Sequence, residues 1–196
     1  MDYAGSDRAG VPVSIKILIA GGFGVGKTTL VGSVTEIRPL RTEEPLTEQG
    51  THVDMLDGVE RKTTTTVALD FGRITIRENL VVYLFGTPGQ DRFWFLWDEL
   101  AFGALGAVVL ADTRRLADCF PSVDYFEQRG TPFVVGVNCF DGAQRFSPDS
   151  VRNALDLDPD VPVVLCDARD RQSGKTVLIA LVEHVASRRG EPVPAA

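Results

Sequence analysis

Apolar residues occur in short runs along this chain, separated by polar segments that are rich in glycine, proline or charge. The pattern predicts six strands, because each run has the length of a typical strand and is bounded by turn residues. The predicted strands cover residues 13–20, 67–71, 80–85, 105–111, 132–137 and 161–166. The first run is almost continuously apolar, which is typical of a strand buried on both faces of a sheet.

Helices are predicted between most of these strands. Helical spacing of apolar residues and helix-starting residues place them at 27–36, 91–104, 113–130, from 147 onward and 174–188. Pro121 is expected to interrupt or restart the third of them. Residues 67–85 read as an antiparallel hairpin. We therefore expect an α/β fold: a mostly parallel six-stranded sheet with one antiparallel hairpin strand and helices on both faces.

The pattern indicates one domain at residues 13–188. Residues 1–12 and 189–196 are small or polar and are expected to be a flexible leader and tail. Residues 37–64 form a long polar insert with little sustained period. A loop of this length inside a compact domain is usually functional or partly disordered.

The segment from Gly21 to Thr28, GGFGVGKT, carries the clearest chemical signal. It lies between a predicted strand and a predicted helix, the context that a G-x-x-x-x-G-K-[ST] phosphate loop requires. Its backbone N–H groups can surround a phosphate, Lys27 adds positive charge, and the Thr28 hydroxyl can hold Mg²⁺. The alternative is an ordinary glycine-rich turn, against which the complete motif argues. The residues expected to bind the nucleotide here are Gly22, Phe23, Gly24, Val25, Gly26, Lys27, Thr28 and Thr29.

Composition narrows the class of protein. Hydrophobic residues make up 44% of the 196 residues, which is enough for a sizeable core. The net charge of −7 argues against nucleic acid or an anionic membrane surface as the main partner. No apolar run approaches the length of a membrane span, so no direct membrane insertion is expected. No secretory or lipidation signal is visible and the three cysteines lack metal-ligand spacing, which predicts a cytoplasmic, reduced protein.

A second polar motif, Asn138-Cys139-Phe140-Asp141, directly follows a predicted strand. The Asp141 carboxylate can accept from the ring N–H and the exocyclic amine of guanine, and adenine does not present these two donors together. Two charge-assisted bonds of about 1.5–3 kcal/mol each would favour guanine by about two to four powers of ten. The alternative is a simple turn, since Asn and Asp both favour turns.

With these motifs the chain resembles the Ras-like small GTPases over residues 13–188. The resemblance implies a P-loop G domain that binds GTP or GDP with Mg²⁺ and hydrolyses GTP to GDP and phosphate. Thr66 would be the switch I threonine and the second hydroxyl on Mg²⁺, with Thr65 as an alternative in the same threonine run. Gly89 would donate its N–H to the γ-phosphate, and Gln90 would orient the attacking water.

The resemblance also implies a base site. Asp167, Ala168 and Arg169 stand where the family has its S-A-K loop, so the Ala168 N–H would donate to the guanine oxygen. Cys139 replaces a lysine whose stem normally packs on the base, which predicts lower nucleotide affinity. Cys139 and Cys166 both lie near this predicted site, either as a redox-sensitive pair or as two ordinary thiols.

Two stretches, residues 37–46 and 84–93, look like the bacterial conservon-type GTPases, relatives of the MglA polarity GTPase. That resemblance implies a role in bacterial signalling. It also implies a Roadblock/LC7-type regulatory protein and a sensor-kinase-like membrane protein as partners. Such partners would recruit the protein to the inner face of the membrane.

Position 86 departs from the family's pattern. Switch II of the family usually begins with an Asp that steadies Mg²⁺ through water, whereas Gly86 has no side chain. Mg²⁺ would then depend on Thr28, phosphate oxygens, water and Thr66. Asp112 is a candidate substitute, although a cap at the end of its strand explains it more simply.

The segment after switch II contains more aromatic residues than one apolar face requires. The stripe at helical spacing consists of Phe93, Leu96, Trp97 and Leu100. The aromatic residues outside it are Trp94, Phe95 and Phe102. They indicate either a surface for a protein partner or a surface that residues 37–64 cover, and the sequence favours neither.

The sequence therefore predicts a guanine-nucleotide switch that hydrolyses GTP slowly with Mg²⁺. Gly86 motivates a rival, a nucleotide-binding scaffold without turnover. A third reading, a small-molecule kinase, predicts ATP preference and an arginine-rich lid, and the base motif and the P-G-Q run weigh against it. No arginine finger is assigned, since Arg61 and Arg92 are more simply solvated.

Overall fold

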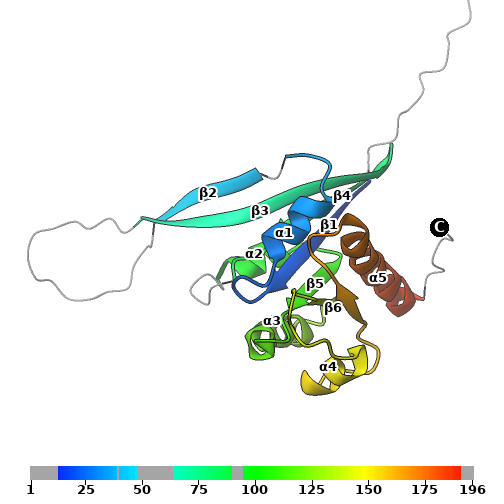
Figure 1. The fold of residues 1–196 in the computed structure, drawn as a ribbon. Helices are drawn as coiled ribbons and strands as arrows, with labels where there is room; N and C mark the ends of the chain where they lie inside the picture. Colours follow the sequence, from blue (N-terminus) through cyan, green and yellow to red (C-terminus); the bar gives the residue numbers. More distant parts are fainter. Residues whose placement is uncertain (1–12, 39, 48–63, 90–94, 191–196) are drawn as a thin grey trace, which may run out of the picture.

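A seven-stranded sheet forms the centre of the molecule, in the strand order β2-β3-β4-β1-β5-β6-β7 (Figure 1). The computed structural model describes residues 13–38, 40–47, 64–89 and 95–190. The strands are β1 (Val13–Gly21), β2 (Leu40–Thr47), β3 (Thr64–Arg77), β4 (Leu80–Gly86), β5 (Gly106–Ala111), β6 (Phe133–Asn138) and β7 (Val163–Cys166). Strand β3 is antiparallel to β2 and β4, and all other pairs are parallel. The predicted α/β class and mostly parallel sheet are confirmed.

The additional strand is β2, for which the sequence predicted only a loop. Residues 40–47 pair with β3 from Leu40 opposite Phe71 to Thr47 opposite Thr64, so the loop prediction is wrong for this part of 37–64. The segment reads LRTEEPLT, with no clear alternation of apolar and polar residues. An edge strand is held by backbone pairing on one side and tolerates proline, so its sequence carries little signal.

Helices cover both faces of the sheet (Figure 1). They are α1 (Lys27–Val34), α2 (Trp97–Ala101), the 3₁₀ helix η2 (Leu116–Cys119), α3 (Phe120–Gln128), α4 (Pro148–Ala154) and α5 (Arg171–Arg189). Alternate residues of β1 face different layers: Ile17 packs with α1 and α5, and Leu18 packs with α2, α3 and α4. The expected burial of β1 on both faces is confirmed, because successive side chains of a strand point to opposite faces.

Three helical segments of the structure can be compared in detail with the predicted helices. The helix expected at 91–104 is reduced to the short α2, and residues 90–94 lie outside the described part of the chain. The segment 113–130 divides into η2 and α3, and Pro121 lies in the first turn of α3, where its missing N–H costs nothing. Ser147 caps α4 as predicted, since its hydroxyl accepts from the Ser150 N–H at 3.1 Å.

The aromatic stripe is confirmed at Trp97, which is only 2% exposed. Its ring lies 5.0 Å from that of Tyr125 and 5.8 Å from that of Phe126, between centroids. Phe95 and Phe102, by contrast, are 61% and 85% exposed, so the described residues do not cover them. Trp94 lies outside the described part.

Among the described helices, none has both the length and the apolar character that a membrane crossing needs.

Gly174 allows α5 to lie close to α1. A Cβ atom at this position would be 2.6 Å from Val34 Cγ1 and 2.9 Å from Leu30 Cδ1, and both neighbours are fully buried. We expect Gly174→Ala to lower the free energy of unfolding by about 1–3 kcal/mol, because overpacking outweighs the better helix propensity of alanine. Urea denaturation measures the change.

The matched control is Thr176→Ala, an exposed position on the same helix. Alanine should there be neutral or slightly stabilising. If Gly174→Ala were as stable as the wild type, the close contact of α1 and α5 would not constrain this position.

Candidate functional site

Loops that are far apart in the sequence meet beyond the carboxyl ends of the parallel strands, as the alternating pattern predicted. A Cβ atom at Gly89 would lie 2.5 Å from Lys27 Nζ and 3.1 Å from Phe23 N. A Cβ atom at Gly26 would lie 2.6 Å from Asn138 Nδ2 and 3.4 Å from Ala168 Cβ. The phosphate loop therefore contacts the start of switch II on one side and the predicted base motifs on the other.

The phosphate loop adopts a backbone that only glycine enters readily. Gly21, Gly24 and Gly26 have φ angles of 126°, 74° and 107°. Gly26 precedes the first residue of α1, so Thr28 and Thr29 lie exposed in the first helical turn. A helix N-terminus offers free N–H groups and a partial positive charge, and both favour an anion such as phosphate.

Lys27 lies beneath this loop and is 9% exposed. Its Nζ donates to the carbonyl oxygens of Gly21 at 2.7 Å and Gly22 at 2.8 Å. Burial lowers the pKa of Lys27 to about 8, and the charge of Asp70 partly opposes that shift. The ammonium group is thus still mostly protonated at neutral pH and is available to an anion in the loop.

The sequence did not predict Asp70 as part of the site. The Thr28 hydroxyl donates to Asp70 Oδ2 at 2.5 Å. Asp70 lies on β3 directly opposite Gly86 on β4, and a Cβ atom at Gly86 would be 3.0 Å from Asp70 Cβ and 3.2 Å from Oδ2. A carboxylate from the neighbouring strand thus occupies the space beside Gly86. The signal in the sequence is an Asp in the strand that pairs with a glycine-ended strand, and it is readable only once the register is known.

Asp112 is bonded to Arg114. This favours its role as a cap at the end of its strand over a role as a substitute for the acidic residue that supports Mg²⁺. Its carboxylate accepts from the backbone N–H of Arg114 at 2.9 Å and from the Arg114 guanidinium at 2.7–3.2 Å. These bonds lower the pKa of Asp112 although it is only 3% exposed. Its two oxygens are therefore satisfied without a metal.

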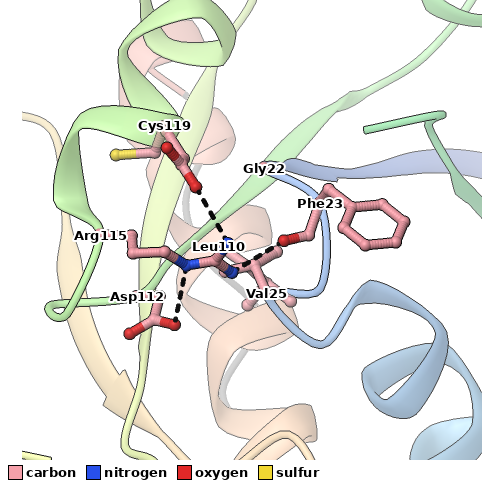
Figure 2. Close-up of a pocket in the computed structure, with 8 residues that line it drawn as sticks. Gly22, Phe23, Val25, Leu110, Asp112, Arg115 and Cys119 are labelled. Carbon is pink, nitrogen blue, oxygen red and sulfur yellow. Dashed lines mark hydrogen bonds and ion pairs between the residues drawn. The ribbon is translucent and has the colours of Figure 1, made fainter. Parts of the chain in front are cut away.

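Arg115 is a second residue that sequence reasoning did not find. Figure 2 shows it reaching from the start of η2 to the phosphate loop, where Nη2 donates to the Phe23 carbonyl oxygen at 2.9 Å. Asp118 holds the guanidinium from the other side, with Oδ2 3.6 Å from Nη1. The Phe23 ring points away from this contact and is 67% exposed. Arg115 thus positions the outer part of the loop.

Asn138 connects the phosphate loop to the loop after β7. Its Nδ2 donates to Val25 O at 2.9 Å, its Oδ1 accepts from the Ala168 N–H at 3.0 Å, and it is 6% exposed. The Ala168 N–H, expected to donate to guanine, thus donates to Asn138.

Burial raises the pKa of the nearby Cys166 thiol to about 12. A thiol with a raised pKa is a poor nucleophile, which favours an ordinary thiol over a redox-sensitive pair with Cys139.

Arg169 lies between two carboxylates at the outer end of this region. Its Nη1 and Nη2 donate to the two oxygens of Asp141 at 2.7 and 3.1 Å. Its Nε and Nη2 donate to the two oxygens of Asp167 at 2.9 and 2.7 Å. The hydrogen bonds from Arg169 lower the pKa of Asp141 and lower that of Asp167 to about 2. Both carboxylates are therefore ionised acceptors at neutral pH.

Two further predicted residues remain predictions. Thr66 lies on β3, four residues before Asp70, and its side chain is outside the described part of the structure. Gln90 lies outside the described residues.

A family model described as "Conserved hypothetical ATP binding protein" matches residues 19–188 of this chain. "Uncharacterized protein MJ1339" from Methanocaldococcus jannaschii is 32% identical over 101 residues, which are 52% of this chain and 53% of that protein. The match thus spans about half the length of that curated relative. Neither description names a reaction.

Solved structures of FeoB iron transporters share the fold. The cytosolic domain of the T. maritima protein in a GDP form has a TM-score of 0.64 at 18% identity, covering 90% of this chain and 65% of that one. The G domain of the same transporter has a TM-score of 0.61 at 18% identity and covers 88% and 99%. The FeoB G domain from Methanococcus jannaschii has a TM-score of 0.58 at 17% identity and covers 88% and 98%.

These likenesses support a nucleotide-binding domain with the fold that the FeoB G domains have. They do not support the narrower resemblance to conservon-type or MglA-like proteins. Because the solved structures are less than a fifth identical in sequence, they bear on the fold alone.

Proposed function

The chain belongs to the family described as conserved hypothetical ATP-binding proteins, and from its site we propose that it binds guanine nucleotides and hydrolyses GTP slowly with Mg²⁺ as a molecular switch. One observation carries the proposal. The buried Asn138 bonds to both the phosphate loop and the loop after β7, which sets an N-x-x-D motif beside the phosphate site. An ionised Asp141 in that motif suits the two donors of guanine.

The description of the family names ATP, whereas the base motif favours guanine. The phosphate loop is common to both kinds of protein, so only the base site can distinguish them. The test is to identify the nucleotide released when purified protein is denatured, and then to titrate fluorescent GDP, GTP, ADP and ATP. Release of GDP and tighter binding of guanine nucleotides support the proposal. Tighter binding of ADP and ATP would overturn it.

The residues present fit a nucleotide with Mg²⁺. Lys27 and the N–H groups of the loop would hold the phosphates, and Gly89, which lies against Lys27, would donate its N–H to the last of them. The Thr28 hydroxyl would hold the ion, which prefers oxygen ligands and keeps several waters. Asp70, which accepts from Thr28, would orient that hydroxyl and the waters, as outer partners of metal ligands do.

We expect Asp70→Ala to raise the Mg²⁺ concentration needed to retain bound GDP by about 10- to 100-fold, the usual cost of removing such a partner. The measurement is the dissociation rate of fluorescent GDP during a Mg²⁺ titration. Asp112→Asn is the control, since Asp112 is occupied by Arg114. If Asp112→Asn shifted the titration and Asp70→Ala did not, Asp112 would be the acidic support.

Hydrolysis separates the switch from a scaffold that only binds nucleotide. Gln90 would orient the attacking water. Single-turnover assays with labelled GTP and Mg²⁺ are expected to show slow release of phosphate. Complete absence of release, even with a protein partner added, would favour the scaffold.

The same resemblance that suggested bacterial signalling also motivates our proposal for partners: a Roadblock/LC7-type regulatory protein and a sensor-kinase-like membrane protein that would recruit a cytoplasmic switch. Two exposed aromatic side chains after switch II, Phe95 and Phe102, support a protein-binding surface. Their replacement by serine should weaken binding of the regulator without lowering GDP affinity. Unchanged partner binding would remove this surface from the proposal.

A further inference from the structure

We propose that Arg169 competes with guanine for the carboxylate of Asp141 and so lowers the affinity of the base site. The inference rests on the proposed binding of guanine nucleotides. It assigns Arg169 a role opposite to that of a side chain that packs on the base.

The contact between Arg169 and Asp141 has the same geometry as the proposed contact between guanine and Asp141. Arg169 uses two N–H groups on adjacent nitrogens to bond both oxygens of Asp141, at 2.7 and 3.1 Å. The proposed guanine contact has the same form, since the ring N–H and the exocyclic amine also present two donors side by side. A carboxylate takes one such planar partner at a time in this bidentate arrangement. Guanine and Arg169 therefore exclude each other at Asp141.

A second carboxylate holds Arg169 in place for this competition. Asp167 accepts from Nε and Nη2 at 2.9 and 2.7 Å, and these bonds do not involve Nη1. When guanine takes Asp141, Arg169 can stay on Asp167 and remain close by. When the nucleotide leaves, the Arg169 side chain can bond to Asp141 again with only a small movement.

Exposure keeps the competition modest and reversible. The Arg169 side chain is 57% exposed and that of Asp141 is 83% exposed. Ion pairs in contact with water contribute little, so the competition should lower guanine affinity by about two- to fivefold and no more. An effect of this size would tune release of the nucleotide without preventing its binding.

The test compares Arg169→Ala with Arg145→Ala, each alone and combined with Asp141→Asn, by titration with fluorescent GDP and ADP. Arg145 also contributes positive charge near Asp141, but no hydrogen bond joins the two in the described part of the chain. Arg169→Ala should tighten GDP binding about two- to fivefold, leave ADP unchanged and lose its effect in the Asp141→Asn background. Arg145→Ala should not tighten GDP binding.

Three results would overturn the inference. Weaker GDP binding by Arg169→Ala would mean that the arginine packs on the base. Equal shifts in the two arginine variants would mean a general charge effect. Unchanged GDP binding by Arg169→Ala, with the wild type still preferring guanine, would remove the competition and leave the proposed function standing. A wild type that prefers ADP would instead overturn the proposed function.

Discussion

Lys27→Met is expected to weaken the binding of GDP and GTP by about 100-fold or more, since a charge-assisted hydrogen bond contributes about 1.5–3 kcal/mol and the ammonium group would serve two phosphates. The side chain is 9% exposed, so water screens its charge weakly. Its pKa of about 8 leaves the charge in place at neutral pH. Methionine keeps the length of the side chain and removes the charge. Titration with fluorescent GDP measures the loss.

Lys175→Met is the matched control, because it removes the same charge from α5 at a position that makes no contact with the phosphate loop among the described hydrogen bonds. Its GDP affinity should equal that of the wild type. Urea denaturation of both variants separates lost binding from lost folding, since Lys27 also bonds the Gly21 and Gly22 carbonyls. A Lys27→Met protein that is folded and binds GDP within about threefold of the wild type would exclude the loop as the phosphate site.

Asp141→Asn is expected to change which base the protein prefers. The amide offers one acceptor and one donor where the carboxylate offered two acceptors, so GDP affinity should fall by about 100-fold or more. Xanthosine diphosphate carries an oxygen in place of the exocyclic amine and can accept from the new amide. Its affinity should therefore rise.

ADP serves as the matched ligand in this experiment, because adenine does not need two acceptors at Asp141. Its affinity should be the same in both proteins. If the GDP and xanthosine diphosphate affinities did not change, Asp141 would not contact the base. The N-x-x-D motif would then be a turn at the end of β6.

The phosphate loop and the sheet that carries it were predictable from local sequence. Six of the seven strands contain an apolar run that predicts a strand, although β3 extends well beyond the predicted residues 67–71, and Gly21 to Thr28 is a contiguous motif whose chemistry does not depend on distant residues. The N-cap of α4 at Ser147 and the new helix at Pro121, which lies in the first turn of α3, also follow from neighbouring residues. Each of these features is encoded within a few positions of the chain.

The missed features are contacts between distant positions. Asp70 reaches Thr28 only because β3 pairs with β4 in a register that sets Asp70 beside Gly86. Arg115 reaches Phe23 across 92 positions of sequence. Strand β2 is defined by backbone pairing and not by an apolar face. No local pattern of side chains reports any of these.

The sequence alone thus determined the class of fold and the phosphate loop, and it proposed the base motif, because hydrophobic period and short motifs are local properties. Only the tertiary structure decided which carboxylate lies beside Gly86 and that Arg169 bonds Asp141. The physical reason is that strand register and loop packing determine distances between residues that are remote in the chain. At the phosphate loop, the sequence motif alone identifies Lys27 and Thr28. Asp70 and Arg115 reach the loop only in the folded chain, through contacts with Thr28 and Phe23.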